Sequence, residues 1–314
     1  MGFTGAGRLS TAVLLTLSLS ATPASAQQIR VTLLGTGNPT PTMDRFGPSI
    51  LIEAGGRKFL FDAGRGALQR LTQAQIRWQD IDGVFLTHLH SDHVVGLPDV
   101  WLTGWLVSAG RNRPLRVWGP KGTESMTSHL AAAYEFDIRA RIADHSAPDG
   151  VVMLADDIED GEVFREGGLT ITAFDVDHGS VAPALGYRID FGGRSVVLSG
   201  DTRVSESLAR HAEGVDLLVH EVVVPEALVR AGLPPGRVSS IVAVHATPEQ
   251  AGEVFTRTKP RLAVYSHIVP FGNENDIIAP TRRTYSGPLE LGEDLMVIEV
   301  GEKIEVRRPR RPTP

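Results

Sequence analysis

The sequence predicts a single domain in which mixed β-sheets are flanked by helices. Short apolar runs typical of strands alternate along the chain with segments of helical periodicity, and this order recurs in both halves. No low-complexity linker divides the 314 residues, of which 42% are hydrophobic and 22% are charged. These values are ordinary for a globular protein with a sizeable core.

The N-terminal segment has the pattern of a secretory signal peptide. Arg8 precedes an apolar run at residues 11–21, and residues 24–26 (ASA) form a small-residue cleavage site. The run is shorter than the roughly 20 residues that span a bilayer. We therefore expect cleavage after Ala26, a periplasmic or secreted location, and no membrane association of the mature chain. Because the sequence has no cysteine, any metal must be held by His, Asp and Glu.

The first half of the mature chain carries strand signals on both sides of tight turns. Gly55 and Gly56 separate two alternating apolar runs, which is typical of a hairpin. Segments with apolar residues three and four apart follow the strands. We expect strands at 29–35, 49–53, 57–62, 83–87 and 115–118, and helices at 64–75, 94–108 and 123–134.

The second half repeats this order of elements. Its strand signals are again bounded by glycine turns, and the C-terminal residues 307–314 (RRPRRPTP) are basic and rich in proline, which predicts disorder. The expected division is a signal peptide at 1–26, a single folded domain at 27–306 and a disordered tail at 307–314. We expect strands at 169–175, 184–190, 195–199, 216–220, 261–266 and 295–300, and helices at 205–211, 225–231 and 248–258.

Three histidines and an aspartate lie within six residues, directly after the predicted strand at 83–87. A loop between a strand and a helix can present several side chains to one point. Imidazole and carboxylate suit zinc, and catalytic zinc sites keep a position open for water. Four ligands at this spacing do not all reach one ion, so we expect two adjacent metals. The residues concerned are His88, His90, Asp92 and His93.

This H-x-H-x-D-H loop resembles the signature of the metallo-β-lactamase superfamily. The resemblance extends over nearly all the mature chain, and its motifs are similar to those of the ribonuclease Z branch, which processes tRNA 3′ ends. It implies an α/β (α+β) four-layer αββα sandwich with two zinc ions at one edge. The matching stretches include LLGTGNPTPT at 33–42, FDAGRG at 61–66, HGSVAPALGYRI at 178–189, SVVLSGDTRVSESL at 195–208, HATPEQA at 245–251 and YSHI at 265–268.

The resemblance also implies which residues bind the metals. Each of the more distant candidates follows a predicted strand, as a ligand at a sheet edge should. By position, the first ion would be held by His88, His90 and His178, the second by Asp92, His93 and His267, and both by Asp201.

A further histidine and two carboxylates match functional residues of the family. His245 matches the proton donor to the leaving group, and Glu221 matches the acid that orients it. The alternative for His245 is a residue at a helix start beside Thr247. Asp62 matches a residue that orients metal ligands, and turn chemistry before Gly64 is its alternative explanation.

Three features depart from ribonuclease Z. Its tRNA-binding arm is inserted between the motifs of His178 and Asp201, where this chain has only a plain hairpin of strands at 184–190 and 195–199. The net charge is −6, which gives no general attraction to RNA phosphates. The chain is also expected to be exported. We therefore expect a small-molecule substrate and no nucleic acid partner.

The activity expected from these observations is dinuclear zinc-dependent hydrolysis of a small molecule. A phosphodiester attacked by a metal-bridging hydroxide comes first, with Asp92 orienting the hydroxide and His245 protonating the leaving group. Alternatives are a carboxyl ester or lactone hydrolase, or a hydrolytic dehalogenase of an activated aromatic, with tRNA 3′ processing ranked below them. A non-catalytic binding protein would be expected to have lost ligands or the proton donor, and here all are present.

Aromatic residues after the metal loop suggest one wall of a substrate pocket. Trp101 and Trp105 lie four apart on a predicted helix, so they share a face that could contact an aromatic substrate. The alternative is packing in the core or in a dimer. His145 lies in a loop for which a structural role is favoured. The family resemblance also implies a possible homodimer.

Overall fold

The structure is a computed structural model that describes residues 1–2, 27–107, 110–144, 146–270 and 272–309. Nearly all of the predicted signal peptide, His145 and residues 310–314 of the predicted tail lie outside the described residues. Among the described helices, none is both long and apolar enough to cross a bilayer.

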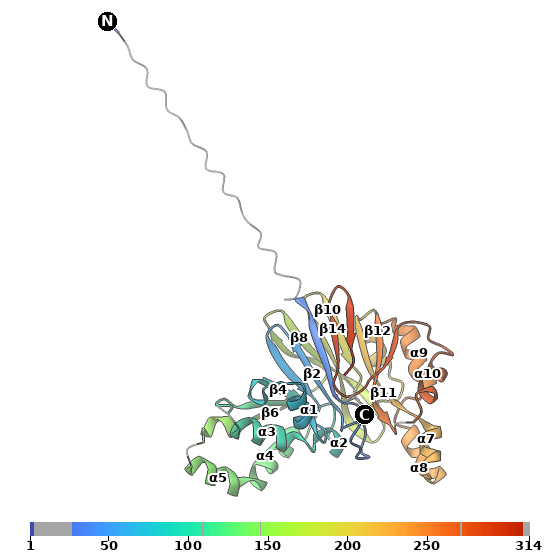
Figure 1. The fold of residues 1–314 in the computed structure, drawn as a ribbon, viewed down its shortest axis with the longest axis horizontal. Coiled ribbons are helices and arrows are strands. Elements are labelled where there is room, and N and C mark those ends of the chain that lie inside the picture. The colour runs from blue at the N-terminus through green and yellow to red at the C-terminus, as the bar shows by residue number, and fades with distance from the viewer. Residues whose placement is uncertain (3–26, 108–109, 145, 271, 310–314) are drawn as a thin grey trace.

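Two β-sheets packed face to face form the centre of the molecule (Figure 1). The eight-stranded sheet has the order β15-β14-β1-β2-β3-β4-β5-β6, and the seven-stranded sheet has the order β13-β12-β11-β10-β9-β8-β7. The strands are β1 (Ile29–Gly35), β2 (Ser49–Ala54), β3 (Arg57–Phe61), β4 (Gly83–Phe85), β5 (Leu115–Gly119), β6 (Met153–Asp157), β7 (Gly161–Glu166), β8 (Leu169–His178), β9 (Val181–Phe191), β10 (Arg194–Leu198), β11 (Leu217–Val223), β12 (Leu262–Val269), β13 (Leu289–Leu291), β14 (Met296–Val300) and β15 (Ile304–Arg307).

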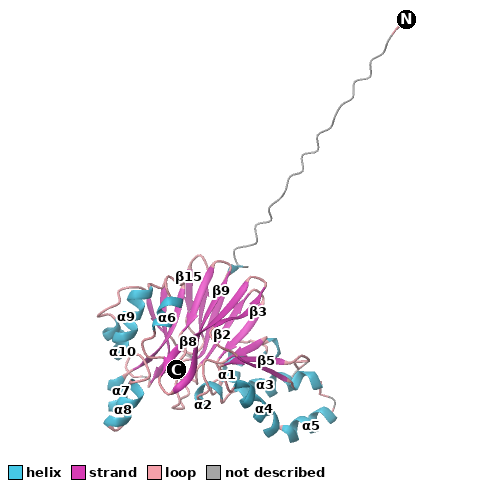
Figure 2. Ribbon diagram, turned by 180° about the vertical axis from the view of Figure 1, so that it is seen from behind, coloured by secondary structure: helices cyan, strands magenta, loops and turns pink. Residues whose placement is uncertain are grey.

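Helices cover the outer faces of both sheets, so the layers follow the expected αββα order (Figures 1 and 2). One core lies between the sheets, a second lies under α6, α9 and α10, and a third lies under α1, α3 and α4. The predicted fold is therefore confirmed. The helices are α1 (Ala67–Gln73), α2 (Ser91–Val94), α3 (Leu97–Leu106), α4 (Thr123–Ala133), α5 (Glu135–Ala143), α6 (Glu206–His211), α7 (Pro225–Arg230), α8 (Pro235–Val242), α9 (Pro248–Thr258) and α10 (Asn275–Thr281).

The central strands are buried on both faces because each sheet lies between the other sheet and a helical layer. In β11, Leu217 and Val219 point into the core between the sheets, and Leu218 points under the helices. Such strands appear in the sequence as continuous apolar runs. This burial explains why short apolar stretches were sufficient to predict most of the strands.

Hydrogen bonds between the sheets fix the end of β4, from which the histidine-rich loop departs. The Tyr187 hydroxyl donates to the carbonyl of Leu86 at 2.6 Å, and the N–H of Leu185 donates to the carbonyl of Thr87 at 2.8 Å. Both donors lie on β9 of the opposite sheet. The loop that begins at His88 is therefore anchored to both sheets.

The helix expected at residues 94–108 is divided into α2 and α3 at Gly96. A Cβ atom at this position would lie 2.3 Å from the carbonyl oxygen of Gly64, so only glycine permits the close approach of the two backbones. Several short elements were not expected, because charged residues interrupt their apolar pattern or, in α10, because Pro280 lies inside the helix. They are β6, β7, β13, β15, α5, α8 and α10.

The interval between His178 and Asp201 contains the expected hairpin. β9 and β10 pair in antiparallel register from Tyr187–Leu198 to Phe191–Arg194, and a two-glycine turn connects them. All residues of this interval are described, so the structure has no inserted arm at this place.

Candidate metal centre

All seven predicted metal ligands converge at one edge of the sandwich, where both sheets contribute side chains. The loop after β4 and the start of α2 supply four of them, and β8, the turn after β10 and β12 supply the other three. The first set is His88, His90, Asp92 and His93, and the second is His178, Asp201 and His267.

The first group of ligand atoms comes from His88, His90 and His178. His90 Nδ1 lies 3.0 Å from His88 Nε2 and 3.4 Å from His178 Nε2. With zinc–nitrogen bonds of about 2.0–2.1 Å, two ligands of a tetrahedral ion are separated by roughly 3.3 Å. The three nitrogens therefore have the spacing of one metal site, in which only His90 is exposed to solvent.

The second group comes from Asp92, His93 and His267. Asp92 Oδ2 lies 3.3 Å from His267 Nε2 and 3.7 Å from His93 Nε2. His267 has a φ of 43°, an uncommon backbone conformation for a residue other than glycine, next to a register shift between β11 and β12. This local distortion turns the imidazole toward the other ligands.

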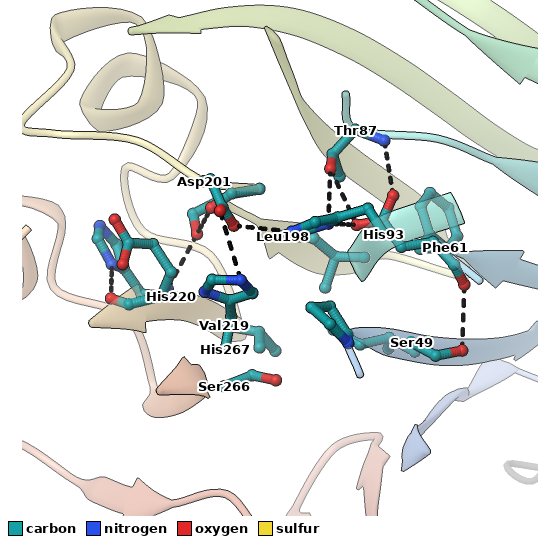
Figure 3. A pocket seen from close by; sticks show the side chains of 16 residues that line it. Ser49, Phe61, Thr87, His93, Leu198, Asp201, Val219, His220, Ser266 and His267 are labelled. Carbon is teal, nitrogen blue, oxygen red and sulfur yellow. Dashed lines mark hydrogen bonds and ion pairs between the residues drawn. The ribbon is translucent and has the colours of Figure 1, made fainter. Parts of the chain in front are cut away.

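Asp201 faces both groups, and Figure 3 shows it beside His93 and His267 of the second group. Its Oδ1 lies 3.4 Å from His93 Nε2, and its Oδ2 lies 3.4 Å from His267 Nε2. Oδ2 also lies 3.9 Å from the Nε2 atoms of both His88 and His178. One carboxylate thus faces ligand atoms of both groups, as expected for a bridging ligand.

The residues present fit a pair of divalent metal ions. His93 Nε2 and Asp201 Oδ1 are buried and have no hydrogen-bond partner, although unpaired buried polar atoms cost free energy. A cation bound between them would satisfy both atoms. Imidazole and carboxylate donors without thiolate suit zinc among the common metals.

Burial and neighbouring charges bring His88 and Asp201 to the ionisation states that metal binding requires. Burial lowers the pKa of His88 well below its ordinary value, so this imidazole is neutral. Burial alone would raise the pKa of Asp201, but His267 and His93 hold it well below the usual range. The centre therefore offers a neutral imidazole and an ionised carboxylate, the forms that bind metal.

Asp62, directly after β3, orients the histidine-rich loop that begins at His88. Its carboxylate accepts hydrogen bonds from the N–H of Thr87 at 2.8 Å and from the Thr87 hydroxyl at 2.9 Å. Its Oδ2 also lies 2.8 Å from His93 Nδ1, which leaves His93 Nε2 to face Asp201 and the other candidate ligands. Asp62 has a φ of 57°, a conformation that aspartate tolerates better than most residues.

Two supporting contacts could not be anticipated from the sequence. The Thr87 side chain supports Asp62, and the backbone carbonyl of Val244 accepts from His178 Nδ1 at 2.9 Å. The second contact joins residues 66 positions apart through a main-chain atom. No side-chain motif could signal it, whereas the position of Thr87 directly before His88 was a weak hint.

His245 lies beside both groups of ligands and is paired with Glu221. Its Nδ1 lies 3.3 Å from Glu221 Oε2, and its ring centroid lies 5.0 Å from that of His178. Burial lowers the pKa of His245, but Glu221 outweighs this effect and raises the pKa to about 9. Metal cations bound nearby would lower the pKa of His245 again, because like charges disfavour the protonated imidazole. His245 can therefore hold a proton at the site.

Glu221 also connects the loop that carries His245 with the turn that carries Asp201. Its Oε1 accepts from the N–H of Ala246 at 3.0 Å and from the N–H of Thr202 at 3.3 Å. These residues directly follow His245 and Asp201. The single buried carboxylate thus positions both the histidine and the central aspartate.

Trp101 and Trp105 do not form a wall of this centre. They are 0% and 3% exposed, and their Nε1 atoms donate to the carbonyls of Val151 and Ala147, each at 2.7 Å. The tryptophans pack in the core under α3, which is the alternative interpretation of their spacing.

Comparison with known sequences gives close relatives over most of the chain. A family model described as a beta-lactamase superfamily domain matches residues 57–268. A Ribonuclease Z from Mycolicibacterium gilvum (strain PYR-GCK) is 39% identical over 279 residues, covering 87% of this chain and 96% of that protein. A Ribonuclease Z from Mycobacterium marinum (strain ATCC BAA-535 / M) is 39% identical and covers 87% and 99% of the two chains.

Solved structures share the fold at lower sequence identity. The metallo-β-lactamase fold protein YhfI from Bacillus subtilis matches with a TM-score of 0.66 and 19% identity, covering 87% of this chain and 99% of that one. Human tRNase Z, short form, matches with a TM-score of 0.62 and 23% identity, covering 86% and 98%.

These relatives contradict the expected small-molecule substrate and the expected absence of a nucleic acid partner. The expectation of an ester, lactone or aromatic halide substrate is wrong for the same reason. The missing arm was misleading, because 279 aligned residues span 96% of a protein named Ribonuclease Z and leave no room for a long insertion in it. The net charge was misleading too, since it describes the whole surface and not the region around the metals.

The evidence for the family is therefore independent of the arm. The αββα layers, the ligands at the edge of both sheets and the extent of the sequence similarity agree. This chain belongs to the metallo-β-lactamase superfamily of metal-dependent hydrolases and, within it, to the ribonuclease Z family.

Proposed function

We propose that this chain is a zinc-dependent phosphodiesterase that cleaves RNA, with tRNA bearing a 3′ extension as its substrate. One observation carries the proposal. A ligand set arranged on both sides of Asp201 lies beside a histidine paired with a carboxylate, in a chain 39% identical to proteins named Ribonuclease Z. The ligands supply the reactive centre, and the paired histidine supplies the proton that a ribose leaving group needs.

Two zinc ions fit the two groups of ligand atoms. When bound, they supply Lewis acidity at the phosphate and lower the pKa of the attacking water. The first ion is assigned to His88, His90 and His178, the second to Asp92, His93 and His267, and Asp201 is assigned to both.

The remaining chemistry belongs to Asp92, His245 and Glu221. The water oxygen bonds to phosphorus while the bond from phosphorus to the leaving ribose oxygen breaks. The Asp92 carboxylate accepts a hydrogen bond from the water, orients it and takes up its proton as the oxygen attacks, and His245 gives its own proton to the leaving oxygen. Glu221, 3.3 Å from His245 Nδ1, directs the other ring nitrogen toward the substrate and keeps the imidazole protonated.

Cleavage of a precursor tRNA tests the proposal. Zinc-loaded protein is expected to release the 3′ extension, and a chelator is expected to abolish the reaction until zinc is returned. A DNA strand of the same sequence and an RNA without the extension are the matched controls. Protein that contains about two zinc ions per chain but leaves all of these RNAs intact would overturn the proposed function.

We also infer export of the chain from residues 1–26. Cleavage after Ala26 would leave every described strand intact, since β1 begins at Ile29. Expression in a bacterium with fractionation of the periplasm, followed by N-terminal sequencing, is expected to give a chain that starts at Gln27. A chain that stays in the cytoplasm and keeps residues 1–26 would contradict this inference.

A further inference from the structure

A groove with a volume of about 490 Å³ adjoins the metal loop. The loop at residues 40–47 forms one side, and the other side is formed by Arg65, Gln69, Val95 and Asp99. None of the seven metal ligands lines it. The groove is thus a hollow distinct from the metal centre.

The backbone under this groove also carries metal ligands. Val95 follows His93 by two residues, so their Cα atoms lie within about 8 Å of each other. At Gly47, which lines the groove, a Cβ atom would lie 3.1 Å from the carbonyl oxygen of Asp92. The groove therefore lies against the same stretch of backbone that carries the metal ligands.

The lining combines apolar surface with a cation. Met43 is 81% exposed and Val95 is 50% exposed, which leaves apolar side chains uncovered inside the groove. The exposed Arg65 donates to the carbonyl of Pro39 at 3.4 Å, and within the described ranges no carboxylate forms an ion pair with it. Gln69 Nε2 lies 3.4 Å from Asp99 Oδ2 and adds a donor and an acceptor.

We propose that this groove binds a nucleotide of the RNA adjacent to the scissile phosphate. The base contacts Met43 and Val95, its polar edge meets Gln69 and Asp99, and the flanking phosphate lies at Arg65. The unpaired guanidinium favours a phosphodiester over a protein segment as the occupant. This inference rests on the proposed function, because it assigns a subsite to the same RNA.

Binding of single-stranded RNA measured against salt tests the role of Arg65. The probe is a fluorescent oligonucleotide of about ten nucleotides with the zinc-loaded protein. Loss of one phosphate contact is expected to reduce the slope of log K against log salt by about 0.7 in Arg65→Ala, and Arg65→Lys is expected to keep the slope. Arg165→Ala is the matched control, since Arg165 is exposed on β7 and paired with Glu162.

The base contacts have a separate readout. Asp99→Asn and Gln69→Ala are expected to change the order of affinities among oligonucleotides that differ only in one base next to the cleavage point. A variant that has only lost its fold or its zinc would bind all of the oligonucleotides more weakly and would keep the order of their affinities. An unchanged order in both variants would remove the base contacts from the proposal.

The outcomes separate this inference from the proposed function. If the wild-type protein cleaves RNA while Arg65→Ala keeps the salt slope of Arg165→Ala, the groove assignment is wrong and the function stands. If zinc-loaded wild-type protein neither binds nor cleaves RNA, the proposed function itself fails. A dimer in which Met43 and Val95 are protected from hydrogen exchange with or without RNA would identify a second copy as the occupant and overturn the groove assignment.

Discussion

His245 is the residue whose removal should separate catalysis from metal binding. It is buried beside the ligands but is not among the seven residues assigned to zinc. His245→Ala is expected to slow RNA cleavage by about 10²- to 10⁴-fold, because the leaving ribose oxygen loses its acid. Aryl phosphodiesters with good leaving groups should slow much less. Steady-state rates with both substrates, together with zinc content, measure the difference.

His129→Ala is the matched control for this substitution. His129 lies exposed on α4, where its Nδ1 contacts the carbonyl of Ser125 within the same helix. Its loss should leave both rates unchanged. Equal losses for RNA and for aryl phosphodiesters in His245→Ala would show that the histidine does not protonate the leaving group.

Asp62 is expected to affect metal affinity without touching a metal. Its carboxylate receives two hydrogen bonds from Thr87 and lies 2.8 Å from His93 Nδ1, so it fixes the orientation of a ligand. Asp62→Ala should weaken zinc binding by about 10- to 100-fold, measured by competition with a chromogenic chelator. Asp137→Ala, on the surface of α5, should leave the affinity unchanged. If zinc affinity is unaltered in both Asp62→Ala and Asp62→Asn, the carboxylate does not orient a ligand and Asp62 serves only the turn before Gly64.

At the scale of elements, a single buried carboxylate holds the loop between β1 and β2. Asp294 accepts from the N–H and the hydroxyl of Thr36, from the N–H of Phe46 at 2.8 Å, and from Arg70 Nε at 2.9 Å. Asp294→Ala would leave the buried guanidinium of Arg70 without its carboxylate partner. We expect the free energy of unfolding to fall by about 3–5 kcal/mol, measured by denaturant titration.

Glu206→Ala provides the comparison for Asp294. Glu206 pairs with Arg257 on the surface, where the two side chains are 68% and 54% exposed. The loss of such a pair should cost less than about 1 kcal/mol. Equal costs for the two variants would mean that the Asp294 network does not stabilise the loop.

Elements differ in how well the sequence predicted them. The central strands were predicted because burial on two faces makes them continuously apolar, as in β11 and β12. Strand β6, at the edge of its sheet, has the sequence MLADD and carries no such signal. The break between α2 and α3 depends on the contact between Gly96 and Gly64, which only tertiary packing creates.

At the scale of the whole molecule, the convergence of the candidate metal ligands at one edge was predictable and the substrate was not. His88 and Asp201 stand in local motifs that follow strands, and strand ends meet at a sheet edge. The small-molecule expectation failed because it was drawn from an absent arm, a global charge and an expected export, none of which describes the surface around the metal ligands. The groove beside Arg65 depends on how the loop at residues 40–47 packs against α1 and the start of α3, so no sequence pattern could signal it.

The metal centre also joins the two halves of the fold. Four of its ligands depart from the eight-stranded sheet and three from the seven-stranded sheet, so bound ions cross-link the sandwich at one edge. Ions that bind only the folded chain stabilise it by mass action, by about 2.7 kcal/mol at a free concentration 100 times the dissociation constant. Removal of zinc should therefore destabilise the whole molecule and not only the metal loop.

Thermal unfolding with and without a chelator tests this coupling. The chelator should lower Tm by several degrees, since a change of about 1 kcal/mol already shifts Tm by roughly 2–4 °C in a chain of this size class. The same chelator saturated with zinc is the control and should leave Tm unchanged. Removal of zinc should also speed hydrogen exchange in β4 and β12. The loop after β4 supplies ligands of both ions, and β12 supplies a ligand of the second ion. If elemental analysis shows that zinc has been removed and Tm is nevertheless constant, the two sheets are held together by their shared core alone, and the metals serve only the chemistry.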